Sequence, residues 1–395
     1  MTLRSSDLRI RLTALKFNGD IVKSQYSGKD IIRAGEFLIK NEADLKTGSQ
    51  FDIAMDILSY WRSIHEAPLE VAFKKLQLVS QRNDKNVILA KRLKRHVSIV
   101  GKLKRFDNMK LKNMQDIGGC RVVLTNEKKL RKVVRELKKD PAFKTNKGSY
   151  KYKDYLKKPK EDGYRSYHLM GRFSDLSGKE RSIEIQLRTR IQHYWATALE
   201  IVDLFTNQAL KSNQGDSNWK AFFSNISEQF SLMDSIHLFG SLTEDQQYDA
   251  LLKLIHKNTD NIQSSSRTKM YATRLNVVDR FAAFSASLKV MEGNESIMSS
   301  GYVLLKIDLN KNDLDTVLFK EAESETAQIE YIEAEKSAAN KAGKVVALVS
   351  TSAVGNIKEA YPNFFADSSQ FIALLGLIEV IPTPTTKVTF PYINA

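Results

Sequence analysis

At residues 116–124 the chain reads Asp-Ile-Gly-Gly-Cys-Arg-Val-Val-Leu. A short β-branched run entered through two glycines predicts a buried strand. A second strand is predicted at residues 180–189, where apolar and polar residues alternate. The apolar face holds Ile183, Ile185 and Leu187, and the polar face holds Glu184, Gln186 and Arg188.

Helices and further strands surround these two stretches. Helical spacing or composition predicts helices at residues 87–105, 127–139, 191–210, 218–233 and 244–289, the last broken near 258–266. Strands are predicted at 150–156 and 164–173, and a turn at 175–178 joins the latter to 180–189 in a hairpin. Strands with interleaved helices indicate an α/β or α+β sheet domain.

The 395 residues predict four parts. Residues 1–84 form a helical N-terminal extension, 85–235 the sheet domain, 236–292 a helical linker region and 293–395 a small α/β module. Within that last module we expect strands at 302–309, 316–320 and 345–350 and helices at 326–341 and 353–360.

Charge is distributed unevenly along the chain. The net charge is +15, yet residues 85–165 hold 26 Lys and Arg against 8 Asp and Glu, a local charge of +18. Residues 290–395 carry 8 basic and 14 acidic residues, a charge of −6. The basic middle should attract a polyanion such as a nucleotide or nucleic acid, although a solvated lysine-rich face is the commoner reason for a charge run.

Composition excludes several classes of protein. A hydrophobic content of 42% and a charged content of 27% exclude a wholly disordered or fibrous chain. The single cysteine, Cys120, excludes an internal disulfide framework and a Cys-rich zinc site. The longest apolar run, 371–381, is too short to cross a bilayer, and residues 1–12 lack a signal-peptide core. We therefore expect a cytoplasmic protein without a membrane partner.

Familiar catalytic motifs are absent. The sequence has no G-x-x-x-x-G-K-[ST], no H-E-x-x-H and no His-Asp dipeptide, so neither a Walker loop nor a His-Asp metal hydrolase is expected. Instead, Lys94, Ser98 and Lys102 stand four residues apart and would share one face of a helix. Such a row can grip a polyphosphate, or it is simply a solvated amphipathic helix.

Two other stretches carry candidate ligand-binding groups. Tyr164 follows a glycine and could stack a base, with Lys160 and His168 reaching polar groups of the same ligand; alternatively, Tyr164 and His168 cap a half-buried sheet face. Asp116 and Glu184 would suit a Mg²⁺ ion bound to triphosphate oxygens, provided that their carboxylates converge.

Together these stretches resemble the RelA/SpoT alarmone synthetase domain over roughly residues 50–235. The resemblance rests on their order and spacing: Arg92-Leu-Lys with Ser98-Ile, Asp116-Ile-Gly-Gly-Cys-Arg121, Tyr155 with Pro159-Lys-Glu-Asp-Gly-Tyr-Arg-Ser-Tyr-His168, and Glu184-Ile-Gln-Leu-Arg-Thr189. The fold implied is α+β, a mixed sheet flanked by helices. The activity implied is transfer of pyrophosphate from ATP to the ribose 3′-hydroxyl of GDP or GTP, with release of AMP and without a hydrolase domain.

The resemblance also implies roles on the ATP side. Arg92 and Arg121 would clamp the adenine, and Lys94, Ser98 and Lys102 would contact the phosphates. Asp116 and Glu184 would be the catalytic carboxylates that hold Mg²⁺, and Glu184 is also a candidate to activate the attacking hydroxyl.

On the acceptor side, Tyr164 would stack the guanine. The other acceptor-binding residues implied are Lys160, His168, Gln186, Arg188 and His193. His193 stands where an amide residue is common in the family, and Trp195-Ala-Thr-Ala-Leu-Glu200 differs from the Trp-Ala-Thr-Leu-Glu-His of many small synthetases, so recognition of the acceptor is less defined than that of ATP.

Three functions stay open at this point. The acceptor is GDP or GTP, or it is the 3′ end of tRNA, as in the toxic, CapRel-like branch of the family that serves in toxin–antitoxin or anti-phage systems. A third interpretation, a catalytically dead RNA-binding relic, is disfavoured by the intact Asp116 and Glu184. The −6 module suggests a regulator that restrains the basic domain, or a plain solubility module. A homo-oligomer, and a phage or antitoxin protein bound to this module, are compatible with the resemblance.

Overall fold

The computed structural model describes residues 26–40, 49–175, 177–206, 210, 215–292, 301–308, 311, 313–338, 341, 344–351 and 364–383. Outside these ranges lies the helix expected at 353–360. Outside them also lie residues 1–25 of the expected N-terminal extension and residues 293–300 of the expected α/β module. No helix in the described ranges has the length and apolar character needed to cross a membrane.

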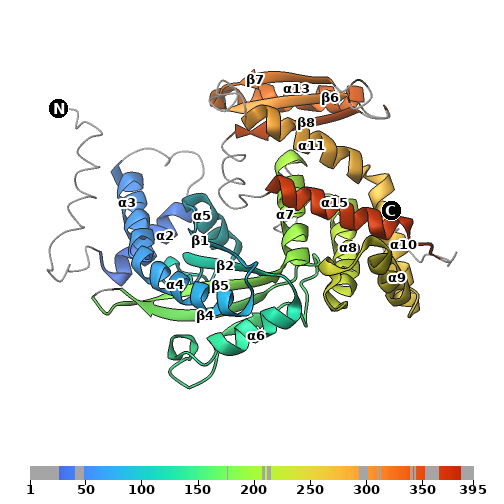
Figure 1. Ribbon diagram of the computed structural model, residues 1–395. Helices are drawn as coiled ribbons and strands as arrows, with labels where there is room; N and C mark the ends of the chain where they lie inside the picture. Colours follow the sequence, from blue (N-terminus) through green and yellow to red (C-terminus); the bar gives the residue numbers. More distant parts are fainter. Residues whose placement is uncertain are drawn as a thin grey trace. The chain divides into compact units, whose positions relative to one another are not determined.

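The larger sheet has five strands in the order β1-β2-β5-β4-β3. Figure 1 labels β1, β2, β5 and β4. Their bounds are β1 Ile88–Leu93, β2 Gly118–Leu124, β3 Tyr152–Asp154, β4 Tyr167–Ser174 and β5 Glu180–Thr189. The hairpin expected before β5 is present, because Gly178 N donates to Asp175 O at 3.0 Å. An α+β fold with a mixed sheet flanked by helices, as expected from the sequence, is confirmed.

The prediction of one long basic helix at 87–105 is wrong for the first half of this range. Residues 88–93 form strand β1, and helix α5 covers only His96–Arg105. Leu, Ala, Lys and Arg all favour a helix by themselves, but pairing with β2 in the sheet overrides that weak preference. Lys94 therefore precedes the helix and does not share its face with Ser98 and Lys102.

Packing divides the chain into two compact units, and the first comprises residues 1–75, 93–120 and 170–184. Its helices are α2 Gly28–Lys40, α3 Ser49–Ser63, α5 and the first part of α4 Glu66–Asn83, with a 3₁₀ turn at Leu111–Asn113. Gly35 is required where α2 meets this turn, since a Cβ there would lie 2.7 Å from Leu111 Cβ. The core of this unit includes Ile31, Ile57, Leu58, Trp61, Ile99 and Leu103.

The second unit comprises residues 76–92, 121–169 and 185–395. Its helices are α6 Glu127–Leu137, α7 Arg190–Thr206, α8 Ser217–Ser235, α9 Glu244–Ile255, α10 Thr259–Arg274 and α11 Val277–Glu292. The break expected near 258–266 lies at the start of that range: Asn258 caps α10 by accepting from Asn261 N at 2.8 Å. A further break follows at Asn276, whose φ of 48° ends α10 before α11 begins.

A smaller sheet and two more helices complete this unit. The strands β6 Tyr302–Asp308, β7 Asp313–Phe319 and β8 Lys344–Ser350 pair antiparallel in the order β7-β6-β8, and the helices are α13 Ser324–Ala338 and α15 Phe364–Val380. One face of β6 and β8 joins the core of the helices, and the other packs on Ala327 of α13. α15 packs against α7 (Figure 1). It contributes Phe371 to the same core. Residues 301–351 thus share a core with the helices that precede them.

Candidate functional site

In the first unit, the centre of the candidate site is the carboxylate of Asp116, just before β2. Lys94 Nζ lies 3.0 Å from Oδ2, and Lys102 Nζ lies 2.8 Å from Oδ1. Both lysines are largely shielded, with side chains 15% and 26% exposed. The structure therefore brings together three of the residues expected to handle phosphate and metal, although Lys94 is not on the helix.

Electrostatics keep this carboxyl ionised. Burial alone would raise the pKa of Asp116, but the charges and hydrogen bonds of Lys94 and Lys102 outweigh burial and hold the pKa below its ordinary value. The single negative charge of Asp116 neutralises only one of the two ammonium charges. The excess positive charge is available to an anionic ligand.

Arg62 on α3 positions this cluster, and sequence reasoning missed it. Its Nε donates to Lys94 O at 2.8 Å, and Nη1 lies 3.0 Å from His96 Nε2. Lys94 N in turn donates to Ile117 O at 2.7 Å. Arg62 lies 32 residues before its partner within a helical stretch, so no local pattern could have identified it.

The glycines at the start of β2 allow β5 to approach. A Cβ at Gly118 would lie 2.6 Å from Ile183 Cδ1, and a Cβ at Gly119 would lie 3.7 Å from Glu184 O. The backbone of Glu184 therefore passes beside Gly119, three residues after Asp116. Glu184 and Ser98 are both half-buried. The described residues contain no group of three or more His, Cys, Asp or Glu able to hold a metal ion.

In the second unit, Tyr164 is the centre of a separate cluster. Its hydroxyl accepts a hydrogen bond from Arg188 Nη2 at 2.9 Å and lies 2.8 Å from His168 Nε2. Burial would raise the pKa of Tyr164, but the charges of Arg188 and His168 and their hydrogen bonds lower it to about 7. Tyr164 and His168, expected to serve one ligand, are thus in direct contact.

Cations and rings surround the Tyr164 side chain. Lys160 Nζ lies 4.8 Å from the centre of the Tyr164 ring and 5.2 Å from the centre of the Tyr155 ring. The Arg188 guanidinium lies 5.1 Å from the centre of the Tyr164 ring. Trp195 on α7 meets it edge-on at 6.3 Å. Lys160 is exposed whereas Arg188 is 4% exposed, so of these two cations Lys160 is the one whose side chain meets solvent.

A tight turn at 160–164 presents this tyrosine. Gly163 N donates to Lys160 O at 2.9 Å, and Lys160 N donates to Tyr164 O at 3.2 Å. Gly163 has a φ of +87°, and a Cβ there would lie 3.0 Å from Phe223 O. Both the backbone conformation and the space require glycine.

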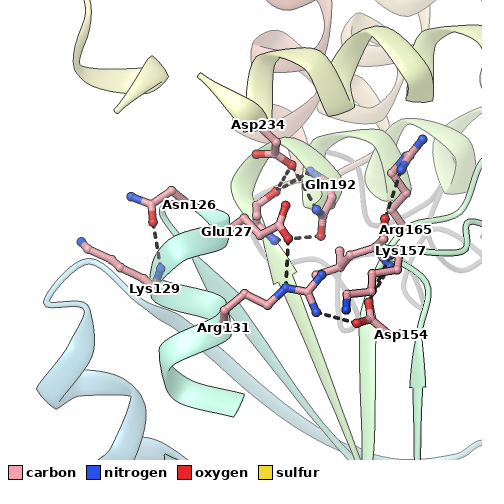
Figure 2. A network of polar contacts seen from close by, with 11 residues as sticks. Asn126, Glu127, Lys129, Arg131, Asp154, Lys157, Arg165, Gln192 and Asp234 are labelled. Atoms are coloured by element: carbon pink, nitrogen blue, oxygen red, sulfur yellow. Dashed lines mark hydrogen bonds and ion pairs between the residues drawn. The ribbon is translucent and has the colours of Figure 1, made fainter. Parts of the chain in front are cut away.

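A polar network in the same unit supports the start of α7 (Figure 2). Thr189 and Gln192 cap this helix reciprocally, Thr189 N donating to Gln192 Oε1 and Gln192 N to Thr189 Oγ1. Both side chains also donate to Asp234 Oδ2, at 2.7 and 3.0 Å. Asp234, far along the chain on α8, was not expected from the sequence. It lines a cavity of about 10 Å³, room for one water, with Arg165, Ser227 and Trp195.

The remaining expected residues lie on the same elements. Arg92 on β1, Arg121 on β2 and Gln186 on β5 are half-buried, and His193 on α7 is 6% exposed. Their ligand-binding roles stay predictions.

One family model matches the chain. Residues 91–201 match the model described as "Region found in RelA / SpoT proteins". This segment contains every candidate residue named from the sequence, from Arg92 to His193. No curated protein matches the chain.

Solved structures of similar proteins cover about half of the chain. The small alarmone synthetase 1 from Bacillus subtilis, bound to its product pppGpp, is 25% identical, with 45% of this chain and 93% of that chain covered and a TM-score of 0.37. The small alarmone synthetase 2 from the same organism is 24% identical, with 45% and 94% covered and a TM-score of 0.38. A GTP pyrophosphokinase family protein from Streptococcus pneumoniae is 22% identical, with 49% and 97% covered and a TM-score of 0.38.

Proposed function

Since residues 91–201 carry the region found in RelA/SpoT proteins, we propose that the chain is a pyrophosphokinase that transfers pyrophosphate from ATP to the ribose 3′-hydroxyl of GDP or GTP and releases AMP. The observation that carries this proposal is the ionised Asp116 held between Lys94 and Lys102 inside the matched region. In-line phosphoryl chemistry needs positioning and fixed positive charge rather than a covalent nucleophile.

On the donor side, Lys94 and Lys102 bind the phosphates of ATP together with Ser98. An incoming triphosphate offers these lysines stronger anionic partners than the single carboxylate of Asp116. Their transfer to phosphate releases both oxygens of Asp116 for a cation. Arg92 and Arg121 are assigned to the adenine.

A Mg²⁺ ion is assigned to Asp116 and Glu184. This ion prefers oxygen ligands and is commonly held by one or two carboxylates with substrate phosphates and waters. Asp116 is kept ionised, and Glu184 lies on the strand beside Gly119. When bound, Mg²⁺ neutralises charge that develops on the phosphate oxygens. Glu184 is also assigned to take the proton of the attacking hydroxyl.

On the acceptor side, Tyr164 stacks the base after Lys160 moves off the ring. Hydrogen bonds with Arg188 and His168 hold the Tyr164 hydroxyl in position. Gln186 and His193 are assigned to the walls of the acceptor site.

The test is release of AMP from ATP with Mg²⁺ and either GDP, GTP or bulk tRNA as acceptor. We expect Asp116→Asn and Glu184→Gln each to lower AMP release with GDP or GTP at least about hundredfold, because each removes a charge aimed at the transition state. The matched control is Asp107→Asn, an exposed acid of the same segment, which should retain full activity.

Each acceptor gives a distinct result. Labelled product with tRNA alone would replace the nucleotide acceptor by the toxin-type activity. If no acceptor gives a product, the remaining interpretation is a catalytically dead protein that binds nucleotides or RNA.

A further inference from the structure

A second ligand surface lies at the end of the larger sheet, outside the candidate site. Residues 141–153 contain four lysines and no Asp or Glu. All four lysine side chains are exposed, and Tyr152 among them is 47% exposed. We call this surface the lysine edge; it consists of Lys144, Lys147, Lys151, Tyr152 and Lys153.

The lysine edge is a built structure rather than a loose loop. Lys144 and Tyr150 form an antiparallel bridge, and Thr145 N donates to Ser149 O at 2.8 Å. Gly148, with a φ of +74°, closes the turn by donating to Thr145 O at 2.9 Å. The spacing of the lysines is therefore set by a hairpin that leads directly into β3.

The position of β3 leaves this row accessible. β3 is the last strand in the sheet order and pairs with β4 on one side. Lys153 pairs directly with His168 in the register, so it lies on the same face of the sheet as that residue. The lysine edge thus continues from the Tyr164 cluster towards Lys144.

Aromatic rings line the opposite face. Lys138, at the end of α6, places its Nζ 4.0 Å from the ring centre of Tyr152, 5.0 Å from Tyr150 and 5.6 Å from Tyr167. Tyr152 and Tyr167 are stacked, with ring centres 5.5 Å apart. The half-buried Lys138 and the stack with Tyr167 hold Tyr152 in place, while almost half of the Tyr152 side chain meets solvent.

We propose that the lysine edge binds a single-stranded polynucleotide at a site separate from the acceptor site. The lysines contact successive phosphates along the edge of β3, and a base reaches round this edge to stack on Tyr152, which lies on the opposite face of the sheet from Lys153. Rows of cations beside an exposed, fixed aromatic ring are the combination by which proteins hold single strands without reading their sequence. An anionic lipid surface fits less well, because the edge has no apolar helix face to insert.

The probe is a fluorescein-labelled oligouridylate of twelve nucleotides whose 3′ end carries a phosphate, so that it cannot accept pyrophosphate. We expect the full-length chain to bind it, measured by fluorescence anisotropy, with affinity that falls steeply as salt is raised. The triple charge reversal Lys147→Glu, Lys151→Glu and Lys153→Glu should weaken binding at least about tenfold. It should also reduce the slope of log affinity against log salt by about 2, because each single-strand phosphate contact contributes about 0.7.

Matched variants separate the surface from overall charge. Reversal of Lys253, Lys257 and Lys311, which are exposed elsewhere in the same unit, changes net charge equally and should leave the affinity within about twofold. Tyr152→Ala should weaken binding about tenfold at unchanged salt slope, since it removes stacking but no charge. Circular dichroism checks that each variant is folded.

Three results would overturn the proposal. One is equal weakening by the two triple variants, and another is displacement of the oligonucleotide by GDP, which would place it in the acceptor site. The third is binding of phosphatidylglycerol vesicles, but not of the oligonucleotide, through the lysine edge. AMP release with GDP is measured separately, so loss of the proposed transfer activity and loss of this binding site are distinguishable.

Discussion

Arg188 and Tyr164 form a pair in which one guanidinium both donates to the phenol oxygen at 2.9 Å and lies 5.1 Å from the ring centre. Arg188 is almost fully buried at the end of β5, and Tyr164 follows the turn at Gly163. A residue of the polar face of a strand therefore sets both the position and the proton affinity of a tyrosine 24 residues earlier.

The pH dependence of Tyr164 follows from this pair. Its pKa is lowered to about 7, whereas the ordinary value is 10.0. A titration followed by absorbance at 295 nm should therefore show a step near pH 7 that Tyr164→Phe removes. Arg188→Gln should shift the step upward, because the remaining effect of burial favours the neutral phenol. Persistence of the step at the same pH in Arg188→Gln would contradict the assignment.

The same shift has a sign for stability. The phenol is more acidic in the folded chain than in the unfolded chain, so its ionisation stabilises the fold. That contribution is complete above pH 10 and is lost as the pH falls through about 7. The free energy of unfolding of Tyr164→Phe should therefore fall further below that of the original chain as the pH is raised from 7 to 10.

Sequence patterns located the two clusters but not their supports. Ile183, Ile185 and Leu187 are fully buried as their alternation predicted, because a period of two leaves little ambiguity. β1 was mistaken for a helix since its residues have helical propensity and only tertiary pairing selects the strand. α15 carries apolar residues all round, so no periodicity marked it. Arg62 and Asp234 act across long separations, which a local pattern does not encode.

Asp84 is a buried charge on which the stability of the second unit is expected to depend. It is 2% exposed, accepts from Thr125 N at 2.7 Å and from Thr125 Oγ1 at 2.9 Å, and pairs with Lys129 at 3.0 Å. Asp84→Ala leaves these donors without their acceptor and should lower the free energy of unfolding by about 3 kcal/mol, measured by urea denaturation. The exposed Asp56→Ala should cost less than about 0.5 kcal/mol.

Acid should act through the same residue. Burial raises the pKa of Asp84, but the hydrogen bonds from Thr125, Lys129 and Asn86 outweigh it, so the pKa lies below the ordinary 3.8. The stabilisation is present above that value and is lost as the pH falls below it. The difference in unfolding free energy between the original chain and Asp84→Ala should therefore be constant from pH 5 to 7 and shrink below about pH 4. A constant difference down to pH 2 would be inconsistent with this account.

Phe371 should connect helix α15 to Tyr164, which is proposed to bind the acceptor. It lies 6.3 Å from Phe223, which meets Trp195 at 5.6 Å, and Trp195 meets Tyr164 at 6.3 Å. Phe371→Ala opens a cavity in a fully buried cluster and should cost about 3–5 kcal/mol of stability. If the ring contacts transmit the change, the KM for the acceptor rises and that for ATP stays constant. Val380→Ala, at a 66% exposed position of the same helix, is the control, and equal KM changes for both substrates would argue for general loosening instead.

Gly163 and Gly178 provide a matched pair that isolates steric fit at the turn 160–164. Both have a positive φ, +87° and +77°, so alanine at either position incurs a similar backbone cost of about 1–2 kcal/mol. Only at Gly163 would the added Cβ meet backbone, 3.0 Å from Phe223 O and 3.0 Å from Ser224 Cα; at Gly178 nothing lies within 4 Å. Gly163→Ala should therefore lower the Tm by several degrees more than Gly178→Ala and raise the KM of the acceptor at least about tenfold, because the displaced turn carries Tyr164. Thermal unfolding and initial rates measure both quantities, and equal effects of the two substitutions would show that the turn tolerates displacement and that Tyr164 does not depend on it.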